Sequence, residues 1–259
     1  MSSLNLVRAT AAAALRGTPE TRPLRDDVTA AGLRAELADL VFACGATTDH
    51  PLVVRSASLR SDLTMASASA FARLRGLYVT AALRLIVNGS APRNPFQELT
   101  VAFERLGGQS DVATMLAALT GDDRARLDAE LRAHVSILTR ELGTIAPSWR
   151  PRTMVRSAVL VAGGALELRD QVDVMVGTHT SPVASLALLD VTTSPLGPEA
   201  ERVMRYHALV STLRTGSLPL RTAMLSSATG ERWTVDVTPE LLQRAVADIA
   251  SLSSMAVAA

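Results

Sequence analysis

The segment "RSAVLVAGGALELRDQVDVMVG", residues 156–177, is where the hydrophobic pattern of this chain changes from helical to alternating. It contains two runs of strand-like residues separated by Gly163-Gly164, a combination that is typical of a β-hairpin. The segment "VASLALLDVTT", residues 183–193, is a nearly continuous apolar run, which indicates a central strand covered on both faces. We therefore predict a β-sheet that begins after Pro151.

The rest of the C-terminal part alternates between helix and strand. An amphipathic helix over 197–216 precedes two strands, over 218–227 and 232–238. Thr238 as N-cap and Pro239 at the first helical position then predict a terminal helix. The order strand, strand, strand, helix, strand, strand, helix predicts a mixed sheet with a right-handed crossover and helices packed on it.

Upstream of the sheet, apolar residues recur at spacings of three and four, which is the period of an amphipathic helix. The expected helices cover residues 29–45, 67–89, 94–108, 110–120 and 121–143. We predict an α/β protein with a helical N-terminal region over 1–150, packed on an α/β core over 151–259. No repeat or low-complexity linker divides the chain, so we expect one compact unit.

Composition excludes several classes of function. The chain carries 26 basic and 25 acidic side chains for a net charge of +1, so no global field favours nucleic acid. Every basic residue among these is arginine, which excludes any mechanism that needs a lysine. Cys44 is the single cysteine, so an internal disulfide and an iron–sulfur cluster are both excluded. Without a long apolar window or a secretory pattern, we expect a cytoplasmic protein with no membrane partner.

Two aspartates are the candidate site residues. Asp190 ends the apolar run in "SLALLDVTTS", residues 185–194, and Asp173 lies on the preceding strand. A buried carboxylate is costly unless it has a partner, and two carboxylates on adjacent strands suit Mg²⁺ or Mn²⁺. The alternative for Asp173 is a structural role, hydrogen-bonded to turn amides or paired with Arg169. The alternative for Asp190 is likewise a structural carboxylate.

The ordered set "ELRDQVDVMVG" (167–177), "ALLDVTTS" (187–194) and a following helix that bears Tyr206 resembles the RecB-like branch of the PD-(D/E)XK nuclease superfamily. The resemblance implies a restriction-endonuclease-like mixed sheet flanked by helices, and metal-dependent hydrolysis of DNA. It implies that Asp173 and Asp190 are catalytic and bind the metal. The carbonyl of Val191 would be a further metal ligand.

This sequence departs from the family at three positions. Thr192 stands where the family has its catalytic lysine, Thr80 where it has a histidine metal ligand, and Arg202 where it has a glutamine, four residues before Tyr206. Threonine can replace neither the charge nor the reach of lysine, and losing one such charge contact typically costs ~10²–10³ in rate. We therefore predict impaired catalysis.

Three hypotheses follow for function. The first is a catalytically impaired nuclease fold that binds DNA, with Arg75, Arg202 and Arg205 as candidate contacts. The second is an active metal-dependent DNA nuclease in which an arginine replaces the lysine. The third is a module that binds a protein partner and no nucleic acid. A wider set of arginines is a candidate groove for phosphates: Arg73, Arg75, Arg84, Arg150, Arg152 and Arg156. The histidines, His207 among them, are expected to be structural.

Overall fold

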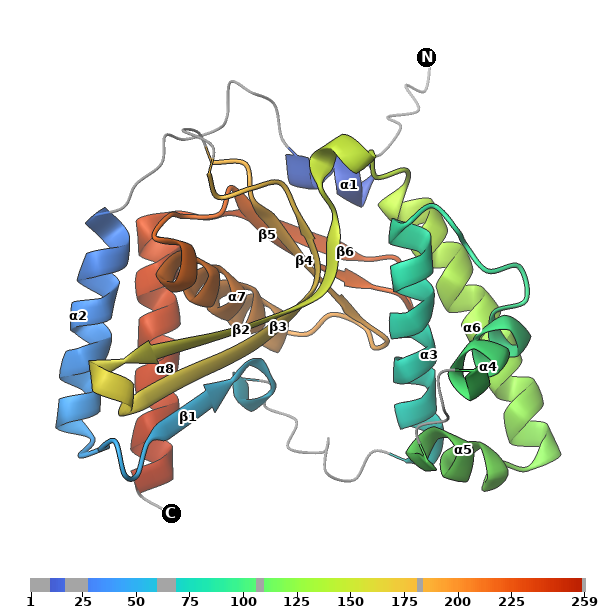
Figure 1. Ribbon diagram of the computed structural model, residues 1–259, viewed down its shortest axis with the longest axis horizontal. Helices are drawn as coiled ribbons and strands as arrows, with labels where there is room; N and C mark the ends of the chain where they lie inside the picture. The colour runs from blue at the N-terminus through green and yellow to red at the C-terminus, as the bar shows by residue number, and fades with distance from the viewer. Residues whose placement is uncertain (1–9, 17–27, 60–68, 106–109, 181–183, 258–259) are drawn as a thin grey trace, which may run out of the picture.

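The computed structural model describes residues 10–16, 28–59, 69–105, 110–180 and 184–257 (Figure 1). The strands are β1 (Leu52–Arg55), β2 (Arg152–Val161), β3 (Leu166–Val176), β4 (Ala187–Thr192), β5 (Arg221–Ser226) and β6 (Arg232–Asp236). The helices are α1 (Ala11–Arg16), α2 (Val28–Ala43), α3 (Ala70–Val87), α4 (Pro95–Arg105), α5 (Ser110–Ala117), α6 (Gly121–Leu142), α7 (Glu199–Thr215) and α8 (Pro239–Val257). The protein is thus α/β, as predicted.

The strands form one mixed sheet. The path runs β1, β3, β4, β5, β6, and β2 pairs with β3 as a hairpin. β4 and β5 are parallel and are joined by α7, which is the predicted crossover, whereas β3 with β4 and β5 with β6 are antiparallel. The sequence placed five of these strands. It missed β1, a short strand within the stretch that was expected to be helical.

β3 is the strand on which the sheet divides. β2 pairs with it along nearly its whole length. A strand has only two edges, so β1 and β4 share the other one: β1 pairs with 166–169 and β4 with 174–176. Between them, residues 170–173 face no paired strand on that edge. The two candidate carboxylates lie at this break in the sheet.

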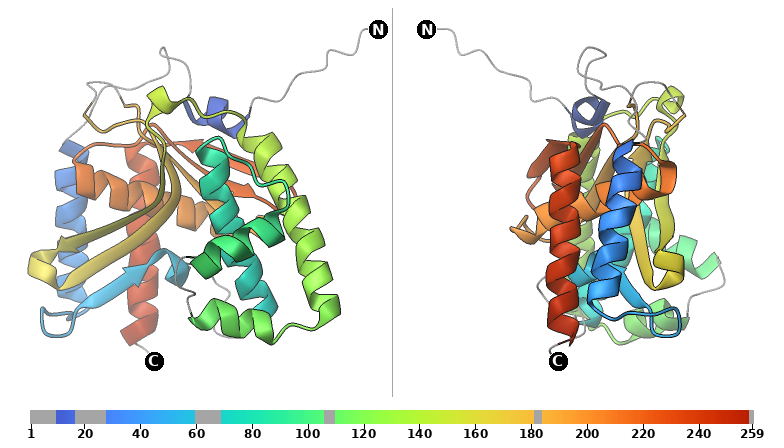
Figure 2. Two further views of the ribbon diagram at one scale, coloured as in Figure 1. Left: turned by 45° about the vertical axis from the view of Figure 1, so that its right-hand side comes forward. Right: turned by 90° about the vertical axis from the view of Figure 1, so that its left-hand side faces the viewer.

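Helices cover the sheet on both faces. On one face, α1 and α3 to α6 share an apolar core with the β4 and β5 end of the sheet. On the other face, α7 contacts β2 to β5 and is itself covered by α2 and α8. Figures 1 and 2 show these two groups of helices on either side of the strands. α7 is therefore an interior helix, and most of its side chains are buried.

α2 and β1 pack with the C-terminal elements. Leu33, Leu37 and Val41 of α2 belong to the same apolar core as Val54 of β1 and the buried face of α7. The helical layer on the opposite face comprises α1 and α3 to α6. The predicted caps of α8 are confirmed, since the helix begins at Pro239 and the Leu241 amide donates to Thr238 Oγ1.

Candidate functional site

Asp173 and Asp190 come together where β3 and β4 stop pairing. The last pair of the ladder is Val174 with Leu189, so Asp173 and Asp190 would form the next pair. Instead of continuing the ladder, their carboxyl groups are hydrogen-bonded to each other. The Val191 amide donates to Asp173 Oδ2 at 2.9 Å. The structure thus brings together the three residues that the resemblance implies as metal ligands, but Val191 presents its N–H to Asp173.

Two residues that the sequence did not single out complete the site. His207 of α7 places Nδ1 2.8 Å and 2.9 Å from the two carboxylate oxygens of Asp170. Its Nε2 lies 3.5 Å from Asp190 Oδ2, an ion-pair distance without a hydrogen bond. We call Asp170, Asp173, Asp190 and His207 the buried Asp–His cluster; Asp173 is half-buried and the other three are buried. The side chains of Asp170 and His207 are only 2% and 1% exposed, so water screens this pair very little.

The cluster shifts the proton affinities of its members. Burial raises the pKa of Asp173 well above its usual value, and the nearby charge of Asp190 raises it further. Burial alone would lower the pKa of His207, but Asp170 and then Asp190 outweigh it and raise the pKa to about 10. Near neutral pH the ring is therefore a cation.

The backbone beside the cluster is strained. The ladder between β2 and β3 includes Val155 with Val172 and Thr153 with Val174, but not Met154 with Asp173. Met154 has a φ of 53°, a left-handed conformation that costs a non-glycine residue roughly 1–2 kcal/mol. Such strain is enriched at functional sites. In a regular strand, Asp170 and Asp173 would point to opposite faces; the distortion accompanies the convergence of both on one cluster.

Thr192, at the position of the family lysine, is held by local hydrogen bonds. Its Oγ1 accepts a bond from the Ser194 amide, and its carbonyl accepts bonds from the amide and the hydroxyl of Ser227. The Ser227 hydroxyl also contacts His134 Nδ1 at 3.0 Å. Because the hydroxyl proton goes to Thr192, the His134 ring donates to Ser227 and does not activate it as a nucleophile. Burial lowers the pKa of His134.

The other candidate residues have identifiable partners or positions. Arg75 pairs with Glu130 at 3.1 Å, and Arg205 pairs with Asp248 at 2.9 Å and with Glu201 at 3.5 Å. Arg202 is half-buried on the first half of α7, and Thr80 is half-buried on α3. Tyr206 is buried, and its hydroxyl lies within hydrogen-bond distance of the Val54 and Arg169 carbonyl oxygens. Tyr206 thereby ties α7 to β1 and β3.

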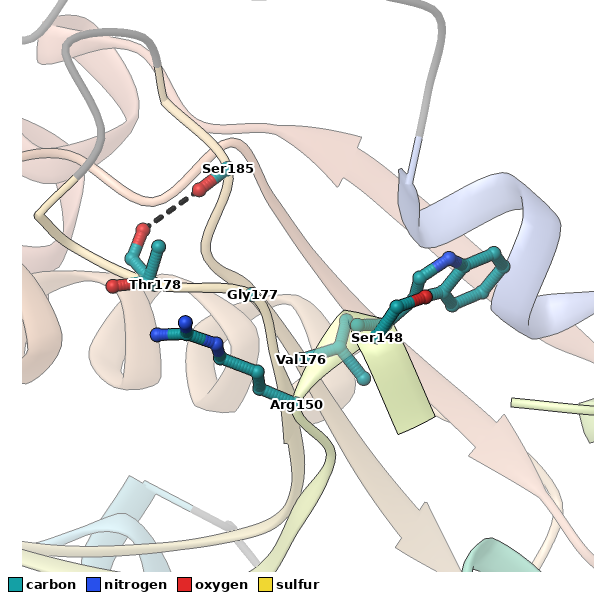
Figure 3. A pocket seen from close by; sticks show the side chains of 7 residues that line it. Ser148, Arg150, Val176, Gly177, Thr178 and Ser185 are labelled. Carbon is teal, nitrogen blue, oxygen red and sulfur yellow. Dashed lines mark hydrogen bonds between the residues drawn. The ribbon is translucent and has the colours of Figure 1, made fainter. Parts of the chain in front are cut away.

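A pocket of about 300 Å³ lies at the end of β3, apart from the cluster (Figure 3). It is lined by Ser148, Trp149, Arg150, Val176, Gly177, Thr178 and Ser185. The Ser185 hydroxyl donates to the Thr178 carbonyl, and Gly177 has a φ of 86°. No residue of the buried Asp–His cluster lines this pocket, so the cluster and this pocket are separate places in the protein.

The cluster does not fit a divalent metal as the resemblance implied. The carboxyl groups of Asp173 and Asp190 are bonded to each other, the Val191 N–H donates to Asp173, and His207 faces Asp190 as a cation. Within the described parts of the chain, no group of three or more His, Cys, Asp or Glu side chains is arranged to hold a metal ion. Magnesium or manganese therefore remains an expectation from sequence alone.

Sequence reasoning missed Asp170 and His207 for different reasons. Asp170 lies three residues before Asp173, and a regular strand would direct the two to opposite faces. His207 follows Tyr206 on a helix that was expected to be amphipathic, so a structural histidine was the ordinary interpretation. One available signal was the presence of a histidine on the helix directly after the strand of Asp190.

Comparisons with known proteins do not identify this chain. No family model matches it, and no curated protein matches it. The solved structure described as "Crystal structure of SSO0001" is similar over 84% of this chain and 84% of that chain, at 7% sequence identity. Its TM-score of 0.34 is too low to support a conclusion about fold or function. None of the helices in the described ranges is long and apolar enough to span a membrane.

Proposed function

We propose that this protein is a RecB-like member of the PD-(D/E)XK superfamily that binds nucleic acid without cleaving it. The observation that carries the proposal is the arrangement of side chains at the C-terminal end of β4. Asp173 and Asp190 converge there, but Thr192 is neutral and its side chain is bonded to the Ser194 amide. A phosphodiester at this place would meet no lysine, and His207 is buried against Asp190. Such a site lacks a positive charge that could stabilise the transition state of cleavage.

An exposed part of one face of the sheet, at β1 to β3, supports the binding part of the proposal. In register, Arg55 of β1 lies beside Arg169 of β3, and Gln171 of β3 lies beside Arg156 of β2. All three arginines are exposed. We call Arg55, Arg156, Arg169 and Gln171 the arginine face. Neighbouring strands are about 4.8 Å apart and alternate residues about 6.6 Å apart, so Arg55 and Arg156 are separated by roughly 12 Å.

The charge of this face is only partly balanced within the protein. Arg169 pairs with Glu167 at 2.7 Å, and Arg156 donates to Gln171. Like charges on neighbouring strands, such as Arg55 and Arg169, repel each other. A phosphate backbone would relieve this repulsion, and guanidinium groups keep several further N–H donors for phosphate oxygens. The proposal is therefore for backbone contacts that do not depend on base sequence.

One experiment tests both parts of the proposal. The purified protein is incubated with single- and double-stranded DNA and manganese, and cleavage and fluorescence anisotropy are measured. We expect no cleavage, together with binding that weakens steeply as salt rises. Manganese-dependent cleavage that is lost in Asp190→Ala would overturn the impaired assignment. Absence of salt-dependent binding would overturn the nucleic-acid assignment.

A charge reversal locates the binding surface. Arg169→Glu is expected to weaken binding to all DNA sequences alike and to reduce the slope of log K against log salt by about 1 or more. Arg132→Glu is the matched control, because Arg132 is also exposed and also ion-paired, with Asp128, but lies on α6. Equal effects of the two variants would show that the arginine face is not the contact surface.

Exposed apolar side chains favour a second candidate, a module that binds a protein partner. Phe42 of α2 is 90% exposed and Leu160 of β2 is 61% exposed. Exposed aromatic residues are enriched in protein interfaces. If the DNA experiment shows no binding, this candidate replaces the first, and Phe42→Ser is the variant with which to test binding of a protein partner.

A further inference from the structure

The strongest unexplained feature of the molecule is a buried histidine among three carboxyl groups. His207 is 1% exposed, and Asp170 and Asp190 are 7% and 5% exposed. Charged groups are almost never buried to this extent unless they are paired. The resemblance to the nuclease family implies that the carboxyl groups of Asp173 and Asp190 hold a divalent cation between them. The question is what supplies the positive charge there.

We infer that the His207 ring takes the place of the divalent cation and is the counter-charge of this site, so that the buried Asp–His cluster excludes metal. The inference deepens the proposed function and rests on it in one respect: only a nuclease-like site would be expected to hold a metal between Asp173 and Asp190. The other steps of the inference rest on the contacts among the atoms of the cluster.

Geometry shows that the ring is held as a cation. Nδ1 contacts both oxygens of Asp170 at 2.8 Å and 2.9 Å, which requires a proton on that nitrogen. Nε2 is buried and lies 3.5 Å from Asp190 Oδ2. An unprotonated Nε2 would place its lone pair beside a buried carboxylate, which is repulsive. With both nitrogens protonated, the ring donates from Nδ1 to Asp170 and places the positive Nε2–H beside Asp190.

Charge balance leads to the same conclusion. Asp170 and Asp190 carry one negative charge each, the ring carries one positive charge, and Asp173 is neutral when protonated. Replacing the two protons on His207 and Asp173 by one divalent metal would leave the net charge of the cluster unchanged. The protonated cluster is therefore as well balanced as a metal-bound one. The raised pKa values of His207 and Asp173 agree with this assignment.

The ring also has no freedom to move aside. The neighbouring Tyr206 fixes the rotation of α7, because its hydroxyl contacts the carbonyl oxygens of Val54 and Arg169 at 2.8 Å and 3.0 Å. α7 is enclosed by the sheet on one side and by α2 and α8 on the other. A metal could enter between Asp173 and Asp190 only by displacing the charge of His207.

Removing the ring should therefore create a metal site. His207→Ala opens space beside Asp170, Asp173 and Asp190 and removes the competing charge. We expect manganese to raise the melting temperature of this variant by roughly 5 °C at a concentration near 100 times its Kd. The wild type should shift by less than about 1 °C under the same conditions, beyond any general effect of the salt.

Two controls make the result specific. His134→Ala removes another buried histidine, 5% exposed, whose Nδ1 contacts the Ser227 hydroxyl, so manganese should leave its melting temperature unchanged. In the double variant His207→Ala with Asp190→Asn, the manganese effect should disappear. If the rescue persists without Asp190, or appears equally in His134→Ala, the inference is wrong.

A measurement on the wild type keeps the inference testable if His207→Ala does not fold. Calorimetric titration with manganese should detect no site in the wild type. A single site that is lost in Asp190→Asn would overturn the inference, even if the protein cleaves no DNA and the proposed function stands. Conversely, DNA cleavage by the wild type would overturn the proposed function, whereas a folded His207→Ala that binds no manganese would overturn only the present inference.

Discussion

Asp170→Asn is the substitution that most directly measures the buried Asp–His cluster. Asparagine keeps the shape of the side chain but removes the negative charge that faces His207 Nδ1 at 2.8 Å. Both side chains are at most 2% exposed, so solvent screening is not a reason to discount the interaction. Removing one partner of a buried ion pair typically costs about 3–5 kcal/mol.

The proton affinity of His207 leads to a similar magnitude. A rise of its pKa from 6.5 to about 10 corresponds to roughly 5 kcal/mol of preference for the charged ring, shared between Asp170 and Asp190. We therefore expect Asp170→Asn to lower the free energy of unfolding by about 3–5 kcal/mol. The assay is urea denaturation at neutral pH, with the transition followed by circular dichroism and by tryptophan fluorescence.

Asp128→Asn is the matched control for this prediction. Asp128 also forms an ion pair, with Arg132 at 2.8 Å, but the two side chains are 29% and 58% exposed. Exposed pairs contribute about 0–1 kcal/mol, so the control should lose little stability. If Asp170→Asn costs no more than Asp128→Asn, the cluster is not a buried charge pair and the reasoning about His207 fails.

Two further predictions concern pH and the β3 turn. Because the pKa of His207 is raised in the folded state, its contribution to stability is complete below pH 6.5 and is lost as pH rises through about 10. The free energy of unfolding measured across this window should fall in the wild type and in His134→Gln, but much less in His207→Gln. The chain has no lysine, so no lysine titrates in this window. Gly177→Ala should destabilise the protein by more than about 2 kcal/mol, because φ is positive and the new Cβ would overlap the Ser185 carbonyl. Gly163→Ala, also at positive φ but with open space around it, should cost about 1 kcal/mol, and equal melting temperatures for the two glycine variants would contradict this reasoning.

Local patterns predicted the elements that carry their own signal. The alternating run over 156–177 became β2 and β3, and the apolar run before Asp190 became β4. Thr238 and Pro239 marked the start of α8 because capping depends on adjacent residues. β1 was missed because Leu52–Arg55 is short and its pairing partner, Leu166–Arg169, lies more than a hundred residues away.

The residues of the candidate site divide in the same way, into those that the local sequence singled out and those that only tertiary contacts revealed. The sequence singled out Asp173 and Asp190, because a carboxylate within or at the end of an apolar strand needs a partner wherever the chain takes it. It did not reveal that Asp170 and Asp173 share one cluster, since that depends on the interrupted pairing between Met154 and Asp173. It did not reveal His207 either, since a histidine on a helix acquires a partner only when that helix is placed over a sheet.

The sequence by itself determined the alternation of strands and helices, the absence of lysine and the neutral Thr192 at the end of β4. These features depend on residue identity and on neighbours along the chain. Only the tertiary structure decided which charge faces Asp190, because burial of α7 between the sheet and two helices brings His207 within 3.5 Å of it. Electrostatic partners are set by distance and desolvation, and neither is a property of the linear chain.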